Sequence, residues 1–228
     1  MEMRTRSLLV PALLAAVLLP GPARADITLT AGAVQVLLAE PELDPLAEQD
    51  WLHAGRVSAG LDLFEGLGLD LAYEGGRLTA PLFEDWDSAL ELDGLLGGVH
   101  YRHEALEWLW PYARVDLGAF KGALSIRTGD TRITAEDWTF FCAASLGLQL
   151  GLPKRLVREW LSIDEDSFFA DLSIALDLSV GWAMYGRLDF DHARMSGPGG
   201  VRYEESAVAL GDLGLDGFRS GIALSVHF

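Results

Sequence analysis

The sequence has little of three things: cysteine, basic residues and long apolar runs. Cys142 is the only cysteine, which excludes an intramolecular disulfide. The chain has 17 lysines and arginines against 34 acidic residues, a formal net charge of −17. Such a charge repels phosphate backbones and excludes nucleic-acid binding as a main activity. Beyond the N-terminal segment, no apolar run approaches the roughly twenty residues that a membrane-spanning helix needs.

The N-terminal segment is typical of a secretory signal peptide. Two arginines precede an apolar run at 7–19, and Ala23-Arg24-Ala25 has the small-residue pattern of a cleavage site. We expect residues 1–25 to be a signal peptide cleaved after Ala25, and 26–228 to form one exported domain. Cleavage would remove three arginines and one glutamate and change the net charge from −17 to −19. The alternative is an uncleaved anchor, whose helix the prolines before the cleavage site would break.

Most of the remaining chain alternates apolar with small or polar residues, a period of two that is typical of two-faced β-strands. The last twelve residues, GFRSGIALSVHF, show it well, with Ile222, Leu224, Val226 and Phe228 on one parity. The same alternation predicts strands at 26–40, 56–64, 67–74, 89–102, 108–120, 140–151, 170–183 and 217–228. A change of phase near Ala33 predicts a bulge in the first strand.

Polar segments between these strands predict loops. They are rich in proline, glycine and acidic residues and lie at 41–50, 75–88, 127–137 and 187–216. The connection at 152–168 is different, because Pro153 suits the first turn of a helix and Leu156, Val157, Trp160 and Leu161 form an apolar stripe. We interpret it as a short helix. It would lie either on anionic lipid or, as we favour, as a lid over the periplasmic mouth.

About eight amphipathic strands, an export signal and a closing phenylalanine resemble the small outer-membrane β-barrel proteins of bacteria, of the opacity/OmpA-like or OmpW-like type. The Pro-Tyr-x-x-x-x-x-Gly-Ala run from Pro111 adds to this resemblance. It implies an all-β fold: a closed antiparallel up-and-down transmembrane barrel of about eight strands, with both termini in the periplasm. Closure also follows physically, since hydrocarbon leaves no partner for the backbone groups of an open sheet edge. The resemblance further implies that Phe228 is an assembly signal read by the barrel assembly machinery, and that lipid of the outer membrane surrounds the chain.

The small or polar parity of such a barrel faces its interior, which eight strands leave just wide enough for side chains to fill. We assign to the interior Arg56, Asp62, Asp70, Glu74, Glu91, Asp93, Arg114, Asp116, Asp171, Asp177 and Arg219. Acids outnumber bases eight to three in this set, so some carboxylates should stay hydrated or take up protons. Aromatic residues near strand ends are expected to form girdles at the two membrane interfaces: Tyr73, Tyr101, Trp108, Trp110, Trp138, Phe140, Trp182 and Phe228.

Patterns of catalysis or metal binding are weak. His100, His103 and Glu104 could hold a metal only if a turn brought them together, because residues three apart in a strand face opposite sides. Ser225 and His227 share a parity, but we interpret them as interior filling and not as a hydrolase site. Cys142 falls on the lipid-facing parity as a small apolar residue. We therefore predict no catalytic, cofactor or metal site.

The leading interpretation is an outer-membrane barrel with a structural or surface-binding role, whose acidic outer loops contact ions, surface sugars or another protein. One alternative is a narrow channel or a conduit for hydrophobic solutes. Another is a soluble, secreted, lipocalin-like barrel, which would turn its apolar residues inward.

Overall fold

The computed structural model describes residues 26–39, 51–64, 66–83, 86–163, 167, 169, 171–190, 194–197, 202–203 and 212–228. The predicted signal peptide (1–25) and the predicted loop at 41–50 lie outside these residues. None of the described helices is long and apolar enough to cross a membrane.

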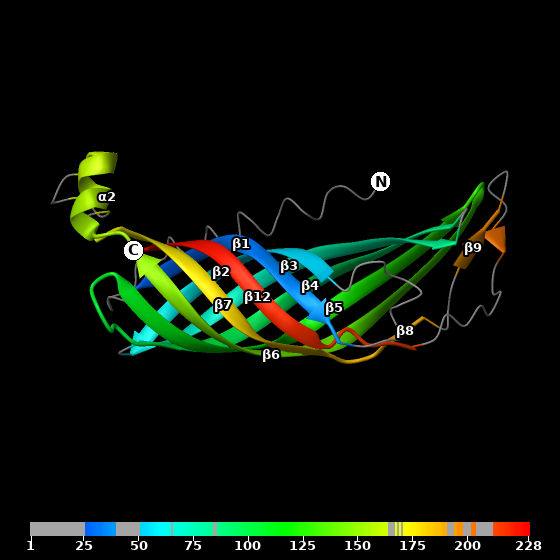
Figure 1. The fold of residues 1–228 in the computed structure, drawn as a ribbon, viewed down its shortest axis with the longest axis horizontal. Coiled ribbons are helices and arrows are strands. Elements are labelled where there is room, and N and C mark those ends of the chain that lie inside the picture. The colour runs from blue at the N-terminus through cyan, green and yellow to red at the C-terminus, as the bar shows by residue number, and fades with distance from the viewer. Residues whose placement is uncertain are drawn as a thin grey trace.

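Eight antiparallel strands form a closed ring (Figure 1). In chain order they are β1 (Ile27–Leu38), β2 (Trp51–Phe64), β3 (Leu67–Phe83), β4 (Trp86–Arg102), β5 (Leu109–Thr128), β6 (Thr131–Gly151), β7 (Ser173–Tyr185) and β12 (Gly217–His227). Each strand from β1 to β7 pairs with the next, and β12 closes the ring by pairing with both β7 and β1. The predicted all-β, up-and-down barrel is confirmed.

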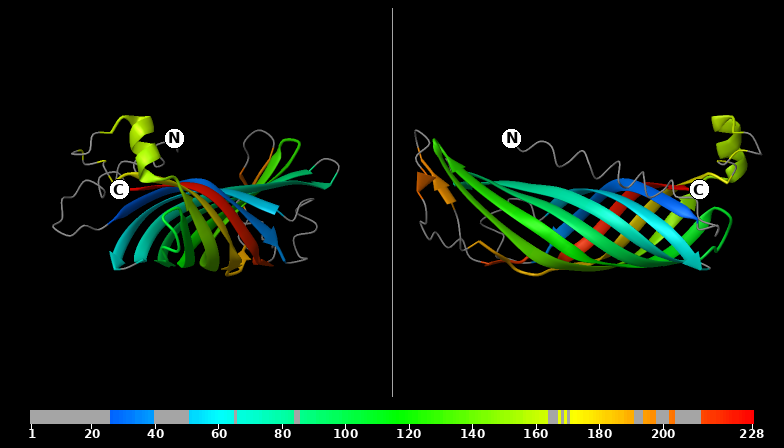
Figure 2. Two further views of the ribbon diagram at one scale, coloured as in Figure 1. Left: turned by 60° about the vertical axis from the view of Figure 1, so that its left-hand side comes forward. Right: turned by 180° about the vertical axis from the view of Figure 1, so that it is seen from behind.

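The strands differ in length, and the barrel is therefore lopsided. β1, β7 and β12 have 12, 13 and 11 residues, whereas β5 and β6 have 20 and 21. As a result β3 to β6 continue past the ring as an open sheet, seen on the right of Figure 1 and on the left in the rear view of Figure 2. We call this the extended end. The opposite end, which holds Ile27 and Phe228, is called the terminal end.

Short elements from the connection between β7 and β12 attach to the extended end. β9 (Arg194–Ser196) pairs with the start of β6 and with β10 (Arg202–Tyr203), so the open sheet gains two strands. β8 (Leu188–Asp189) and β11 (Asp212–Leu213) form a separate two-stranded sheet. The described residues of the predicted loop at 187–216 thus include four short strands.

The connections at the terminal end differ in length, from two residues between β2 and β3 to residues 152–172 between β6 and β7. Gly66, between β2 and β3, has φ 80, and a Cβ there would lie 1.8 Å from the carbonyl oxygen of Arg102, so only glycine fits. The connection between β6 and β7 contains α2 (Lys154–Leu161), which confirms the predicted short helix. In Figures 1 and 2, α2 projects outward past the barrel wall and does not cross the opening, which differs from the lid that we favoured.

Three predictions about strands are wrong. Residues 75–83 belong to β3, and 127–128 and 131–137 belong to β5 and β6, because cross-strand pairing there outweighs the local loop-like composition. β1 pairs with both neighbours without a register shift, so no bulge occurs at Ala33.

Pro111 lies within β5, at the rim, where its carbonyl accepts from the amide of His103.

Candidate functional site

The outer face of the ring is apolar on all eight strands, although on β1 the outward residues are half-buried (Ile27, Leu29, Leu37), small (Ala31, Ala33) or polar (Gln35). The exposed apolar side chains of this outer face are 38–66% accessible and include Val57, Leu61, Leu69, Leu71, Leu95, Val99, Val115, Leu117, Phe140, Leu146, Leu148, Leu178, Val180, Ile222 and Leu224. From Phe140 to Leu150 on β6, at about 3.3 Å per residue and a tilt of about 40°, this belt is about 25 Å tall. A continuous apolar surface of this size cannot face water in a monomer. It is the surface of a membrane-spanning barrel.

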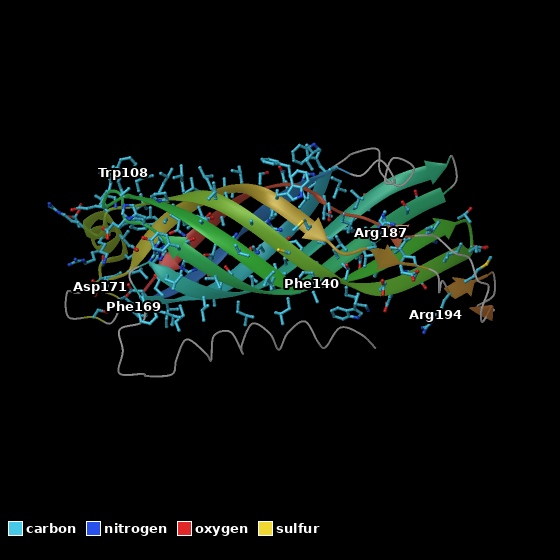
Figure 3. All side chains as sticks on the ribbon, turned by 90° about the horizontal axis from the view of Figure 1, so that it is seen from below. Trp108, Phe140, Phe169, Asp171, Arg187 and Arg194 are labelled. Carbon is cyan, nitrogen blue, oxygen red and sulfur yellow. The ribbon has the colours of Figure 1, made fainter. Side chains whose placement is uncertain are left out.

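Aromatic side chains gather toward both edges of this belt. Trp138, Phe140 and Trp182 lie toward the extended end and are 65%, 61% and 48% exposed, and Tyr101 and Trp108 lie toward the terminal end. Figure 3 shows Trp108 beside α2 and Phe140 farther along the barrel. These positions are those of the predicted girdles.

One of the predicted girdle residues lies elsewhere: Trp110 points inward, with its ring 5.4 Å from that of His227. Tyr73 has the outward parity of β3, is half-buried and donates to Asp93.

Four charged residues meet at the centre of the interior, although their strands are spread around the ring. Arg56 (β2) donates to Oδ1 of Asp116 (β5) at 2.9 Å and lies 3.4 Å from Oε2 of Glu74 (β3). Arg219 (β12) donates to Oε1 of Glu74 at 2.9 Å. Arg114 adds a contact of 3.2 Å to the other oxygen of Asp116. We call these five residues the central ion cluster; the side chains of Glu74 and Asp116 are each only 1% exposed.

A second polar network lies nearer the terminal end. His100 is held between two carboxylates, with Nδ1 2.7 Å from Asp70 and Nε2 2.8 Å from Asp62. Arg102 donates to Asp62 and contacts His227, which is also bonded to Thr28 at 2.8 Å. Hydrogen-bonded carboxylates on both sides hold the His100 ring in one orientation. The network joins β1, β2, β3, β4 and β12 across the opening.

Asp177 connects β7 with β5 and β6 through hydrogen bonds inside the barrel. Its two oxygens accept from the hydroxyl of Tyr112 at 2.6 Å and from the amide of Gln149 at 3.0 Å. Both donors come from β5 and β6, so each strand from β1 to β7 and β12 contributes a polar side chain to the interior.

The interior toward the extended end is apolar instead. Phe120, Phe141 and Tyr185 pack edge to face with ring centroids 4.8–5.2 Å apart. Leu188 and Leu215, from the connection between β7 and β12, are completely buried in the same core. The guanidinium of Arg219 lies 5.6 Å from the Phe141 ring, where the ion cluster meets this apolar plug. We use "apolar plug" for the buried residues of the extended half, which also include Leu92, Leu124, Ile126, Phe190 and Leu213.

Little space remains between these side chains. The two best-defined cavities among the described residues offer about 30 and 20 Å³ to the centres of water molecules. A buried water needs about 10–15 Å³ on this measure, so each has room for one or two waters. The described interior is therefore a packed core and not an open pore.

Eight of the eleven predicted interior charges lie in this core, and three do not. Glu91 is half exposed and faces outward beside Arg77 at 3.7 Å, and Asp93 shares its face. Asp171 precedes β7, is 74% exposed and lies 3.6 Å from Lys154, at the α2 end of Figure 3. β4 was assigned the wrong face because Leu90 and Leu92 share the parity of its inward residues, and we took apolar parity to mean lipid.

The corrected face of β4 changes the charge balance of the interior. Sequence reasoning missed Arg102 and His100, which have the inward parity of β4. The five interior carboxylates then face four guanidinium groups and His100. The predicted excess of eight acids over three bases is wrong, and most of the charge is neutralised by direct pairing.

The residues considered for catalysis or metal binding either lie apart from one another or already form hydrogen bonds in the interior. His100 belongs to the interior network, while His103 and Glu104 are exposed in the turn after β4. Among the described residues, no group of three or more histidine, cysteine or acidic side chains could hold a metal ion. Ser225 is buried and bonded to Thr30 at 3.0 Å.

Two further residues that the sequence singled out lie on or beside the outer face. Cys142 is half-buried on the outward parity of β6. Phe228 donates its amide to Ile27 and lies 6.3 Å from the Phe169 ring.

Comparisons with known proteins agree with this architecture only at low similarity. No family model matches the sequence, and no curated protein matches it. Among solved structures, the chain is similar to Ail, the attachment invasion locus protein of Yersinia pestis, at 10% identity and a TM-score of 0.48 over 90% of this chain and 100% of Ail. Neisserial surface protein A has 11% identity and a TM-score of 0.47, over 92% of this chain and 100% of that protein. The outer membrane protein OprG from Pseudomonas aeruginosa has 12% identity and a TM-score of 0.43, over 90% of this chain and 96% of OprG. At this level of similarity, the fold assignment rests on the strand pairings of the chain itself.

Proposed function

We propose that this protein is an outer-membrane β-barrel with a structural or surface-binding role, and that it neither catalyses a reaction nor conducts solutes. The observation that carries the proposal is a sealed interior beneath an ordered sheet that extends past the apolar belt. A barrel filled by an ion cluster and an apolar plug can serve as a rigid anchor, because moving any one of these side chains breaks contacts with several strands.

The extended end supports a surface-binding role. Its outward side chains are polar and paired across strands, with Lys121 2.6 Å from Glu136 and Arg77 3.7 Å from Glu91. The amide of Asp189 donates to Asp137, which fastens β8 to the edge of β6. An ordered polar sheet at one end of a membrane barrel is suited to hold a binding surface away from the lipid. The ligand or partner protein is unidentified.

Export by residues 1–25 and recognition of Phe228 by the barrel assembly machinery belong to the same proposal. An exported chain whose termini meet at one end would place the terminal end in the periplasm and the extended end at the cell surface. Lipid of the outer membrane would then surround the belt.

A channel or solute conduit is the competing function, and the packed interior argues against it. A soluble lipocalin-like barrel is also disfavoured, because its outer face would be polar.

The test combines fractionation with conductance. The protein should be recovered from the outer membrane, and it should migrate faster on a gel before boiling than after, since a closed barrel resists unfolding by detergent. The folded protein should then give no stable conductance steps in planar bilayers. Recovery in the soluble periplasmic fraction would refute the membrane role, and reproducible conductance steps would refute the sealed interior.

A further inference from the structure

Helix α2 lies where the barrel wall ends. Leu152 still pairs with Ile174 of β7 through its amide, and the helix begins two residues later, after Pro153. It ends at Leu161, and the next residue, Ser162, has a φ of 54 and donates its amide to the carbonyl of Arg158. In Figures 1 and 2 the helix stands away from the barrel wall at the terminal end.

The apolar stripe of α2 is only partly used within the chain. Val157 is buried to 1% exposure. Leu156 and Trp160, one helical turn apart, remain 54% and 76% exposed. The opposite face carries an ion pair, with Arg155 donating to Glu159 at 2.9 Å and 88% of the Arg155 side chain exposed. An exposed tryptophan and leucine on one face of an amphipathic helix need a partner that is at least partly apolar.

Further exposed apolar residues lie near this face in sequence, on both sides of the helix. Leu146 and Leu148 on β6 are 66% and 44% exposed, and Leu152 extends the row to the helix at 47%. Phe169, on the other side of α2 in sequence, is 47% exposed and lies at the same end of the barrel in Figure 3. Exposed apolar residues therefore lie on both sides of the helix, although Lys154 and Arg155 separate Leu152 from Leu156.

Charge on the helix fits the same partner. The helix contains three bases, Lys154, Arg155 and Arg158, and one acid, Glu159, in a chain of net charge −17; Lys154 also lies 3.6 Å from Asp171. The sequence becomes acidic again at 164–166, so the basic character is confined to the helix. Bases on the polar face of an amphipathic helix with tryptophan on the other are typical of helices that lie among phospholipid head groups.

We propose that α2 lies in the head-group region of the leaflet at the terminal end, with Leu156 and Trp160 inserted at the boundary of the acyl chains. The partner is the phospholipid bilayer. The proposal rests on the membrane placement of the barrel, and it adds a lateral contact to the lipid that a bare ring of strands lacks.

The experiment places a fluorescent probe at three positions in a Cys142→Ala background. Leu156→Cys tests the exposed helix face, Arg155→Cys is the matched control on the opposite face, and Leu148→Cys reports on the membrane belt. Each labelled protein is folded into nanodiscs of phosphatidylethanolamine and phosphatidylglycerol, which leave both leaflets accessible. Quenching by iodide in the water is compared with quenching by a lipid spin-labelled near the glycerol backbone.

An interfacial helix lies about 5–10 Å into the boundary region, so the shallow spin label should quench the probe at 156 by roughly half or more. Iodide should quench the probe at 155 and leave that at 156 largely protected. Equal iodide quenching at 155 and 156, with the probe at 148 protected by lipid, would overturn the helix proposal and keep the membrane barrel. An unprotected probe at 148 would refute the barrel placement itself. Shielding of 156 from both quenchers, together with dimers, would assign the face to a second copy and also overturn the proposal.

Discussion

Glu74→Gln is expected to be among the most destabilising single changes in the barrel. Glu74 is 1% exposed and lies between two guanidinium groups, Arg219 at 2.9 Å and Arg56 at 3.4 Å. Arg56 keeps its ion pair with Asp116, but Arg219 loses the one carboxylate with which it pairs directly among the described residues. The change therefore leaves one buried cation without a counterion.

Removing one partner of a buried ion pair costs about 3–5 kcal/mol. We expect the lower part of this range, because the glutamine oxygen can still accept a hydrogen bond from Arg219. A loss of about 3 kcal/mol lowers the folding equilibrium constant by about a hundredfold. The measurement is urea unfolding of the folded protein in detergent micelles, followed by tryptophan fluorescence and by gel mobility, which report the denaturant midpoint.

Glu91→Gln is the matched control, since it removes the same charge from the exposed pair with Arg77. That pair should contribute about 0–1 kcal/mol. A double variant, Glu74→Gln with Arg219→Gln, should recover part of the loss, because no uncompensated charge then remains. Equal midpoints for Glu74→Gln and Glu91→Gln would show that the central ion cluster is hydrated and that its packing has been misjudged.

Two further predictions test the two faces of the wall. Val180→Arg, on the lipid face of β7, should cost about 2–4 kcal/mol and reduce the folded band on the gel, whereas Ala123→Arg, beyond the belt on β5, should be nearly neutral. Gly94→Val should cost about 1–3 kcal/mol, because a Cβ there would meet the Phe120 ring at 2.6 Å, whereas nothing lies within 4 Å of a Cβ at Gly97. A urea midpoint lowered as much by Gly97→Val as by Gly94→Val would contradict the assignment of the β4 faces.

The ring of strands could be predicted from the sequence because alternation is a local signal. In β7 and β12, one parity is apolar and the other is small or polar, and the structure places the apolar parity outward. β4 shows where this signal fails. Leu90, Leu92 and Leu96 share one parity and Leu95 and Val99 the other, so composition does not distinguish the faces. Pairing with β3 and β5 decides them, and that register is not a local property.

The interior networks could be predicted only as a list of charges. Arg56 and Glu74 are cross-strand partners on neighbouring strands, so their contact follows from the hairpin. Arg219 reaches Glu74 across 145 positions in the sequence, and only the closed ring brings them together. The apolar plug was missed for a related reason. Leu188 and Leu215 lie in a segment whose glycine and acid content is typical of a loop, yet they fold into the core.

The position of Arg219 favours one register for the pairing of β12 with β1 and β7. β12 meets β1 and β7 along backbones that could hydrogen-bond equally well in several offsets. An offset of one residue would turn Arg219 toward the hydrocarbon, at a cost of about 2–4 kcal/mol near the midplane, and would leave Glu74 with Arg56, at 3.4 Å, as its only basic partner among the described residues. An offset of two would keep the facing but slide the guanidinium away from its carboxylate. Among these registers, only the native one allows β12 both to close the barrel and to pair Arg219 with the buried carboxylate of Glu74.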